Sequence, residues 1–370
     1  MTNFSDLGVA KNLEKGLQEI GIKKPTKIQQ QAIPVLLENT SDLVARAQTG
    51  TGKTAAFGVP LLSHIDSKSD NIQALVLAPT RELCQQIAKQ FFKFTKYTEK
   101  IFVEAVFGGE KIDKQLARLK RKTHVIVATP GRLIDLIDRK VVDLSKIKIL
   151  VLDEADEMLS MGFKKELSSI FEQSNKNKHT WLFSATIPKS LQEIIKKYVR
   201  LKVVEITIDK NIVINQKITH QFVKAEDVAK LDILTYFLKS RKGERGIIFT
   251  RTKKAARVLA KQLEQKNYSI GLLEGDMTQK DRDKVMRLFI NKKVQLLIST
   301  DVAARGIDVN RLAFVLHYQL PDQIDYYTHR SGRTARGGTE GLSLALVSKD
   351  EFKLMKDIER ELKIEFNQIR

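Results

Sequence analysis

Short, uninterrupted apolar runs alternate along the chain with longer segments in which apolar residues recur at helical spacing. Such runs indicate strands buried on both faces, because a half-exposed strand would alternate apolar and polar residues. Strands that alternate with amphipathic helices are typical of parallel sheets covered by helices on both faces. In the first half, the runs that predict strands are DLVARA (42–47), ALVLAP (74–79), FVEAVFGG (102–109), HVIVATP (124–130), ILVLDEAD (149–156) and TWLFSAT (180–186).

Helices are predicted between the runs of the first half, as over 81–94 and 163–174, and the second half repeats this alternation. Between the halves, the stretch 205–220 is polar and has no helical period. Because 370 residues exceed the usual size of one domain, we predict two domains, 1–208 and 216–370, joined by a linker at 209–215. The runs that predict strands in the second half are GIIFTRT (246–252), SIGLLEGD (269–276), VQLLISTD (294–301), AFVLHYQL (313–320) and GLSLALV (341–347).

Small, charged or hydroxyl residues follow nearly every predicted strand. Parallel sheets bind their ligands beyond the carboxyl ends of the strands, so each domain should present its chemistry along one edge. Two such edges that face each other would form a cleft between the domains. We therefore predict an α/β protein with two mostly parallel sheets flanked by helices and an active site in the interdomain cleft.

The net charge of the chain indicates which class of partner it binds. Lysine and arginine total 64 against 44 aspartate and glutamate, which gives a formal net charge of +20. An excess of this size favours polyanionic partners, above all nucleic acid. Many basic proteins bind no nucleic acid, so charge alone indicates a tendency.

Cysteine usage and the lack of a long apolar run indicate the compartment. Cys84 is the one cysteine, which excludes an intrachain disulfide and favours a reducing environment. The first residues lack the apolar core of a signal peptide, and no apolar run approaches the length that spans a membrane. We expect a cytoplasmic protein with no membrane partner, acting as a monomeric core; which protein partners it has, the sequence does not tell.

AQTGTGKT, residues 47–54, follows the first predicted strand and opens a helical pattern. It matches the phosphate loop G-x-x-x-x-G-K-[ST] except that Ala47 replaces the first glycine. In such loops backbone N–H groups hold the phosphates, the lysine (Lys53) reaches the β- and γ-phosphates, and the hydroxyl (Thr54) binds Mg²⁺. The alternative is a glycine-rich turn with a chance lysine. The nucleotide-binding residues predicted here are Ala47, Gln48, Thr49, Gly50, Thr51, Gly52, Lys53 and Thr54.

A pair of carboxylates, Asp153 and Glu154, ends a buried strand about a hundred residues later. Beside a phosphate loop, a carboxylate at a strand end holds Mg²⁺ as the Walker-B aspartate does. Its neighbour can then orient or deprotonate the attacking water. The alternative is the acidic start of a helix, where carboxylates are common. We predict Asp153 as a metal ligand and Glu154 as the catalytic base.

HRSGRTARGG, residues 329–338, spaces Arg330, Arg333 and Arg336 three residues apart, which on a helix would place them on one broad face. A solvated basic face is the plain alternative. The second domain has no phosphate loop of its own, and an arginine from outside the loop can stabilise charge on the γ-phosphoryl group. We predict that Arg333 and Arg336 complete the site across the cleft, so that hydrolysis requires closure.

The ordered set of motifs resembles that of DEAD-box ATP-dependent RNA helicases. It comprises AQTGTGKT, PTRE, TPGR, DEAD (153–156), SAT (184–186), STDVAARGID and HRSGRTARGG, and the match extends from Phe4 to about Gly338. The resemblance implies two tandem RecA-like domains that bind ATP and Mg²⁺ between them. It also implies RNA-stimulated ATP hydrolysis coupled to local, sequence-independent unwinding or remodelling of RNA duplexes or RNA–protein complexes.

The resemblance also assigns nucleotide and coupling residues. GIKKPTKIQ is similar to the adenine-reading Q motif of the family, in which Gln29 would hydrogen-bond the adenine and Phe4 would stack on it. Read alone, Gln29 is equally a polar residue at an exposed helix start. Asp308 resembles the ribose contact. The residues that would link hydrolysis to domain closure are Asp156, Ser184, Thr186 and His329.

The RNA contacts of the family fall on arginines, threonines and glycines of this chain. Such residues bind phosphate oxygens, which predicts binding without sequence preference, and contacts to 2′-hydroxyls would favour RNA over DNA. Read singly, each of the arginines is more often a surface salt-bridge partner. The positions are Pro79, Thr80, Arg81, Gly109, Thr129, Gly131 and Arg132 in the first domain, and Arg251, Gln279, Arg282 and Thr300 in the second.

Three positions depart from the family pattern beyond the phosphate loop. Ser331 and Ala335 stand where the family usually has isoleucine and glycine, and Glu274 replaces a common histidine. Two other functions remain open: a DNA helicase or translocase of a sister family, and an ATP-gated RNA clamp or annealing protein with little unwinding. Stimulation of ATP hydrolysis by RNA and not by DNA would distinguish an RNA helicase from the DNA translocase. Strand separation in a single turnover would distinguish it from the clamp.

Overall fold

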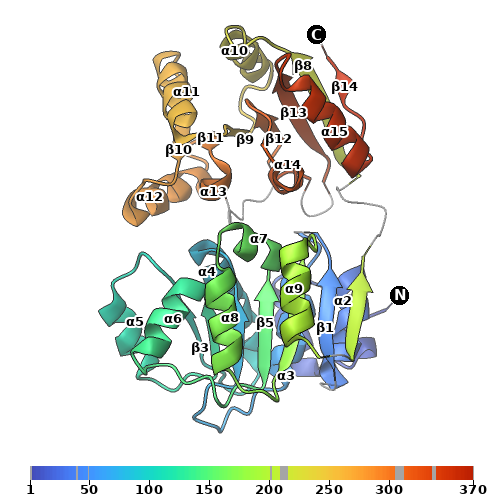
Figure 1. Ribbon diagram of the computed structural model, residues 1–370, viewed down its shortest axis with the longest axis vertical. Helices are drawn as coiled ribbons and strands as arrows, with labels where there is room; N and C mark the ends of the chain where they lie inside the picture. Colours follow the sequence, from blue (N-terminus) through green and yellow to red (C-terminus); the bar gives the residue numbers. More distant parts are fainter. Residues whose placement is uncertain are drawn as a thin grey trace. The chain divides into compact units, whose positions relative to one another are not determined.

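The computed structural model describes residues 2–38, 41–48, 50–200, 202–208, 216–304, 312–335 and 339–369. The chain divides into two compact units, Met1–Asp209 and Lys210–Arg370 (Figure 1). Within the described ranges, each unit contains one seven-stranded sheet, and every strand pairing in both sheets is parallel.

The first unit has the strand order β3-β4-β2-β5-β6-β1-β7. Its strands are β1 (Asp42–Arg46), β2 (Ala74–Leu77), β3 (Val103–Val106), β4 (Val125–Ala128), β5 (Ile149–Asp153), β6 (His179–Ser184) and β7 (Val203–Thr207). Its helices are α1 (Lys11–Glu19), α2 (Lys27–Glu38), α3 (Lys53–Ser63), α4 (Arg81–Phe94), α5 (Ile112–Leu119), α6 (Pro130–Asp138), α7 (Ala155–Ser160), α8 (Lys164–Gln173) and α9 (Lys189–Tyr198), with short 3₁₀ helices at Ser5–Leu7 and Thr95–Tyr97.

Alternate residues of the first sheet enter two separate cores, one on each face. Val76, Val127 and Val151 pack with residues of α1 to α4, whereas their neighbours Leu77 and Leu152 pack with residues of α6 to α9. The continuous apolar runs of the sequence therefore bury both faces of each strand, as expected for a parallel sheet covered by helices. Figure 1 shows helices on both sides of this sheet.

The second unit has the strand order β10-β11-β9-β12-β13-β8-β14, which is the order of the first sheet with each number raised by seven. Its strands are β8 (Ile218–Lys224), β9 (Gly246–Phe249), β10 (Ile270–Leu273), β11 (Leu296–Ser299), β12 (Phe314–His317), β13 (Gly341–Val347) and β14 (Asn367–Gln368). Its helices are α10 (Lys230–Ser240), α11 (Lys253–Gln265), α12 (Gln279–Ile290), α13 (Asp301–Ala304), α14 (Ile324–Ser331) and α15 (Phe352–Leu362).

The predicted α/β architecture with two parallel sheets is confirmed, but the hydrophobic pattern missed β7, β8 and β14. The stretch 205–220, in which the sequence showed no helical period and no strand was predicted, contains the end of β7 and the start of β8. β8 alternates buried and exposed residues and so has no continuous apolar run. β14 is two exposed residues long. Strands near the edge of a sheet have fewer buried positions, which is why their apolar signal is weak.

A buried hydrogen-bonded cluster attaches α14 to the second sheet. The hydroxyl of Tyr327 lies 2.7 Å from Nδ1 of His220 and 3.1 Å from Oγ of Ser343. Ser343 also lies 3.1 Å from Nε2 of His317 and 3.0 Å from Oγ of Ser331. The ring of Tyr327 stacks on that of His317, with centroids 4.6 Å apart. Polar groups, and not apolar contacts alone, therefore fix this helix.

This cluster predicts acid sensitivity of the second unit. Burial lowers the pKa of His220 from 6.5 to about 4, and burial also lowers the pKa of His317. The unfolded chain therefore binds a proton between pH 6.5 and 4 that folded His220 does not. Stability is full above pH 6.5 and falls toward pH 4, by about 1.4 kcal/mol per pH unit for one histidine. We expect His220→Gln to reduce this slope in urea unfolding followed by far-UV circular dichroism.

Fluorescence of Trp181, the one tryptophan of the chain, provides the control, because β6 belongs to the first unit. Its unfolding transition should change with pH equally in the wild type and in His220→Gln. Equal acid sensitivity of the two proteins in the circular-dichroism transition would contradict the assignment of the effect to His220.

Candidate functional site

The strand order of the first sheet brings the predicted nucleotide motifs together. β5, β6 and β1 are neighbours, and because all three run in parallel their carboxyl ends share one edge. The phosphate loop follows β1, the DEAD tetrapeptide begins at the end of β5, and the SAT motif begins at the end of β6. The backbone N–H of Ala47 donates to the carbonyl of Ser184 at 2.9 Å, which joins the loop to the SAT motif.

The phosphate loop needs glycine at two positions and tolerates alanine at its start. Gly50 and Gly52 have φ values of +81° and +95°, which other residues rarely adopt. Ala47 has an ordinary φ and is buried, so its methyl group fits. Gly52 precedes α3, so the first N–H groups of that helix lie directly after the loop. Thr51 Oγ1 donates to the carbonyl of Gln48 at 2.7 Å; Thr49 lies outside the described residues.

Lys53 is the first residue of α3 and is only 6% exposed. Its Nζ has no hydrogen-bond partner among the described residues. A buried ammonium group without a partner is costly, and a bound anion would compensate it. Lys53 therefore has the position and the charge needed to bind a phosphate.

Asp153, the last residue of β5, has a carboxylate with an unsatisfied oxygen. It is 3% exposed, and its Oδ1 lacks a partner in the described part of the chain. Burial raises the pKa of Asp153 to about 7; the charge of Lys53 opposes this shift, whereas Glu154 and Asp156 add to it. A divalent cation would satisfy the free oxygen and favour the ionised form.

Asp153 and the Thr54 hydroxyl fit Mg²⁺ better than a metal that requires a cage of protein ligands. Among the described residues no group of three or more His, Cys, Asp and Glu could hold a metal ion. Mg²⁺ is usually bound by one or two carboxylates together with substrate phosphates and water. Thr54 is the second residue of α3 and half-buried.

Glu154 has an unusual backbone conformation. Its φ and ψ are 54° and 51°, in the left-handed region, and it precedes the first residue of α7. Such a conformation costs about 1 to 3 kcal/mol for a residue with a side chain and is concentrated at functional sites. This strain was not predictable from the DEAD tetrapeptide alone.

Asp156, Ser184 and Thr186, predicted as coupling residues, form one hydrogen-bonded group. Oδ2 of Asp156 accepts from the backbone N–H of Thr186 at 2.8 Å and from its hydroxyl at 2.9 Å. The N–H of Asp156 donates to Oγ of Ser184 at 3.2 Å. The SAT motif is thus attached directly to the DEAD tetrapeptide. His329, the fourth predicted member, belongs to α14 of the second unit and is half-buried.

Gln29 is buried, at 1% exposure, so the reading of an exposed polar residue at a helix start is wrong. Its Oε1 accepts from the N–H of Thr26 at 2.9 Å, and its Nε2 donates to the carbonyl of Gly52 at 3.0 Å. The side chain therefore contacts the phosphate loop and keeps one donor and one acceptor site for a ligand. Phe4 is fully buried in the core of α1 to α4, so stacking on adenine requires its ring to move and stays a prediction.

The predicted RNA contacts of the first unit follow β3, β4 and β2, the other half of the sheet edge. The Thr80 hydroxyl accepts from the N–H of Leu83 and caps α4, and the Arg81 guanidinium lies 4.8 Å from the Phe107 ring centroid. Thr129 precedes α6 without a side-chain cap. Arg132 donates to the carbonyl of Glu110. The remaining positions are Pro79, which is buried, and Gly109 and Gly131, which are exposed.

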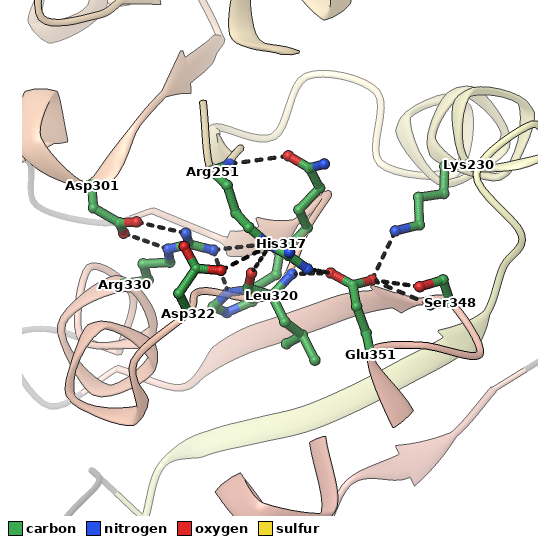
Figure 2. Close-up of polar contacts among 10 residues, drawn as sticks. Lys230, Arg251, Asp301, His317, Leu320, Asp322, Arg330, Ser348 and Glu351 are labelled. Carbon is green, nitrogen blue, oxygen red and sulfur yellow. Dashed lines mark hydrogen bonds and ion pairs between the residues drawn. The ribbon is translucent and has the colours of Figure 1, made fainter. Parts of the chain in front are cut away.

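The predicted RNA contacts of the second unit follow the corresponding strands β10, β11 and β9. Arg282 donates to the carbonyl of Ala303 at 2.7 Å, and Thr300 is buried directly before α13. Gln279 begins α12, but its side chain lies outside the described part. Arg251 follows β9, and Figure 2 shows its side chain directed toward Glu351.

Arg330 and Arg333 of HRSGRTARGG do not share a helix face, because α14 ends at Ser331. Arg330 is 1% exposed and forms a two-pronged ion pair with Asp301. Its Nη1 donates to the carbonyl of Gln319 at 2.7 Å. Arg333 lies after the helix, is buried, and its Nε donates to the carbonyl of His329. The anion of Arg330 is therefore internal; Arg336 and Asp308 lie outside the described residues.

Two family models match the chain: DEAD/DEAH box helicase over residues 26–194, and helicase conserved C-terminal domain over residues 229–338. The chain belongs to the DEAD/DEAH box helicase family. The resemblance read from its motifs to DEAD-box ATP-dependent RNA helicases is thereby confirmed.

Curated DEAD-box relatives match nearly the whole chain. ATP-dependent RNA helicase CshA of Limosilactobacillus reuteri is 40% identical over 363 residues, which cover 96% of this chain and 71% of the relative. The protein of the same name from Listeria monocytogenes is 39% identical over 369 residues, covering 98% and 69%. Among solved structures, S. cerevisiae Dbp5 bound to RNA and ADP BeF3 has a TM-score of 0.92 and 33% identity, covering 100% of this chain and 96% of that one. This match confirms the tandem RecA-like fold.

Several residues that surround the DEAD-box motifs were missed by the sequence. Gln319 connects Arg330 with Arg251. Its backbone carbonyl accepts from the Arg330 guanidinium, and its side-chain oxygen accepts from the backbone N–H of Arg251. Lys230 and Glu351 form a buried ion pair. These residues lie outside the motifs, and the contacts join positions 11, 68 and 121 residues apart in sequence, so no local pattern signals them.

Gly52→Ala should impair nucleotide binding more than folding. Alanine would be strained at φ +95°, and its Cβ would lie 2.4 Å from Nε2 of Gln29. We expect ATP affinity, measured with a fluorescent analogue, to fall by about tenfold or more, since the strain of about 1 to 2 kcal/mol adds to the clash. Gly162→Ala is the matched control, because Gly162 has φ +88° and a methyl group added there would meet nothing within 4 Å. Equal ATP affinity of both variants would contradict the prediction.

Proposed function

We propose that this protein is an ATP-dependent RNA helicase that hydrolyses ATP when RNA is bound and locally separates RNA duplexes without sequence preference. The observation that carries the proposal is a pair of buried groups beside the phosphate loop, Lys53 Nζ and Asp153 Oδ1, which have no hydrogen-bond partner among the described residues. ATP with Mg²⁺ would satisfy both. The RNA-bound state of Dbp5, a protein of the same fold, supports RNA as the polymer.

On the nucleotide side, Lys53 binds the β- and γ-phosphates, and Gln29 binds the adenine edge with its free donor and acceptor. Thr54 and Asp153 would hold Mg²⁺, which would supply positive charge that neutralises the phosphates. Glu154 orients the attacking water and takes up its proton. Phe4 stacks on the adenine and Asp308 binds the ribose.

The arginines of the second unit complete the chemistry. Arg333 and Arg336 approach the γ-phosphate when the two units close, and stabilise the charge that develops there. Such arginines contribute about 10³ to 10⁵ in rate in other hydrolases. Asp156, Ser184, Thr186 and His329 connect this closure to hydrolysis, a role supported by the direct hydrogen bonds between Asp156 and Thr186.

On the RNA side, both units use the strand ends of β3, β4, β2 and of β10, β11, β9. Their arginines, threonines and backbone N–H groups bind phosphates, which explains binding without sequence preference. The net charge of +20 strengthens this contact. We propose a cytoplasmic, monomeric enzyme, since ATP and RNA are both available there and one chain supplies both sets of residues. No described helix is long and apolar enough to cross a membrane.

ATP hydrolysis should respond to RNA and not to DNA. We expect single-stranded RNA to raise the steady-state rate with Mg²⁺ by about tenfold or more, because closure adds arginine stabilisation of the transition state. DNA of the same sequence and length should give little stimulation, since it lacks the 2′-hydroxyls. Equal stimulation by DNA would favour a translocase, and RNA stimulation without strand separation in a single turnover would favour a clamp.

Glu154→Gln should bind ATP and RNA but hydrolyse slowly. The amide keeps the size of the side chain but cannot accept the proton of the attacking water, so we expect kcat to fall by about 10² to 10⁴. RNA release in the presence of ATP, followed by fluorescence anisotropy, should slow because the closed complex persists.

Glu172→Gln serves as the control, because it makes the same chemical change on the exposed surface of α8. Its kcat should equal that of the wild type. Fast release of RNA by Glu154→Gln with ATP bound would count against the role assigned to Glu154.

A further inference from the structure

Glu351 is a buried carboxylate in the second unit that holds two cations. It precedes α15 and is only 5% exposed. Oε2 accepts from Nζ of Lys230 at 2.9 Å, and Oε1 accepts from Nη2 of Arg251 and from the N–H of Leu320, the latter at 2.9 Å. Ser348 donates its N–H and hydroxyl to the same carboxylate (Figure 2). Burial alone would raise the pKa of Glu351, but these partners, first Lys230, hold it below its ordinary value.

The strand order identifies the position in the first unit that corresponds to the Lys230–Glu351 pair. β8 corresponds to β1 and β13 to β6, because the two sheets have the same order. Lys230 is the first residue of the helix after β8, as Lys53 is of the helix after β1. Lys53 has no partner within the described residues, whereas Lys230 is paired with Glu351, which follows β13. An internal carboxylate thus occupies, in the second unit, the role that a ligand phosphate would take in the first.

Arg251 is fixed by this carboxylate at a strand end. Its Nε donates to the carbonyl of Leu320 at 2.7 Å, its Nη2 donates to Glu351, and its N–H donates to Oε1 of Gln319 at 3.1 Å. Exposed Asp322 lies 3.5 Å from Nε. The side chain remains 32% exposed. Arginine has five N–H donors in a planar fork, so donors remain for a phosphate after two are used internally.

We propose that Glu351 is a positioning residue that orders Arg251 for contact with an RNA phosphate, with Lys230 anchoring the carboxylate from the opposite side. This proposal rests on the proposed RNA-binding role of Arg251. Glu351 touches neither RNA nor ATP; it acts through Arg251.

Glu351 is expected to strengthen RNA binding because it orders the long side chain of Arg251 before a phosphate binds. An arginine held by two hydrogen bonds has already lost most of its rotamer freedom, so less is lost when a phosphate binds. Lys230 offsets the charge of Glu351, so that Glu351 does not stand as an uncompensated carboxylate beside Arg251. Lys230 itself is almost fully buried, so it serves the carboxylate and not the RNA.

A double-mutant cycle tests the proposal. The measured quantity is the concentration of single-stranded poly(U) RNA that gives half-maximal ATPase stimulation, in the wild type, Glu351→Gln, Arg251→Ala and the double variant. Glu351→Gln should raise this concentration by about 3- to 10-fold, the effect expected for ordering one side chain. It should leave kcat at saturating RNA unchanged, and should have no further effect when Arg251 is already alanine.

Each opposite result overturns the proposal at a different step. An equal effect of Glu351→Gln with and without Arg251 would show a structural role only. Tighter RNA binding by Glu351→Gln would show that the carboxylate competes with phosphate. No effect of Arg251→Ala would remove the premise that Arg251 contacts RNA, while leaving RNA-stimulated hydrolysis itself intact.

Removing the partner of buried Lys230 can unfold the protein. Two further variants distinguish such a folding defect from the proposed effect on Arg251. Glu351→Asp keeps the charge beside Lys230 but shortens the side chain, and should show the same dependence on Arg251. Asp227→Asn removes the exposed carboxylate 3.1 Å from Lys230 without touching Arg251, and should leave RNA stimulation unchanged. Thermal unfolding of each variant should confirm a folded protein; a defect in Asp227→Asn equal to that of Glu351→Gln would overturn the proposal.

Discussion

Parallel pairing of the strands is the constraint on which the rest of this structure depends. It places the carboxyl ends of neighbouring strands at one edge, so that Lys53 and Asp153, a hundred positions apart along the chain, act on one another. Strand order then divides each edge. In the first unit, β5, β6 and β1 carry the nucleotide motifs, while β3, β4 and β2 carry the predicted RNA contacts. Motifs that alternate along the chain are thereby separated in space.

Buried charge distinguishes the two sheets, although their strand orders agree. At the helix after the corresponding strand, Lys53 has no partner among the described residues, whereas Lys230 is neutralised by Glu351. The first arrangement is costly until an anion binds, and the second is satisfied within the fold. This contrast supports the proposal that the first unit binds a phosphate at this position, whereas the second unit uses the same position for an internal ion pair. The second half of the sequence has no phosphate-loop motif, which agrees with this difference between the two units.

The sequence predicted the parallel sheets because buried strands have continuous apolar runs, and it predicted the nucleotide motifs because their spacing is local. It missed β8, whose residues alternate between buried and exposed, and β14, which is too short to give a signal. It also suggested one helix face for Arg330 and Arg333, although α14 ends between them. The partner of Arg330 is Asp301, from another motif. Such pairs depend on the tertiary fold, which spacing along the chain does not encode.

Ser331 shows how a departure from a family pattern is accommodated by distant residues. An unpaired hydroxyl at a fully buried position would destabilise the fold. Here Oγ of Ser331 lies 3.0 Å from that of Ser343 and 3.4 Å from Nε2 of His317, which are also buried. Tyr327 and His220 extend the same cluster, so the polar group has polar surroundings. Because Arg330 and Arg333 flank Ser331, replacing it affects how the arginine segment is held to the sheet, and not the charge that this segment presents.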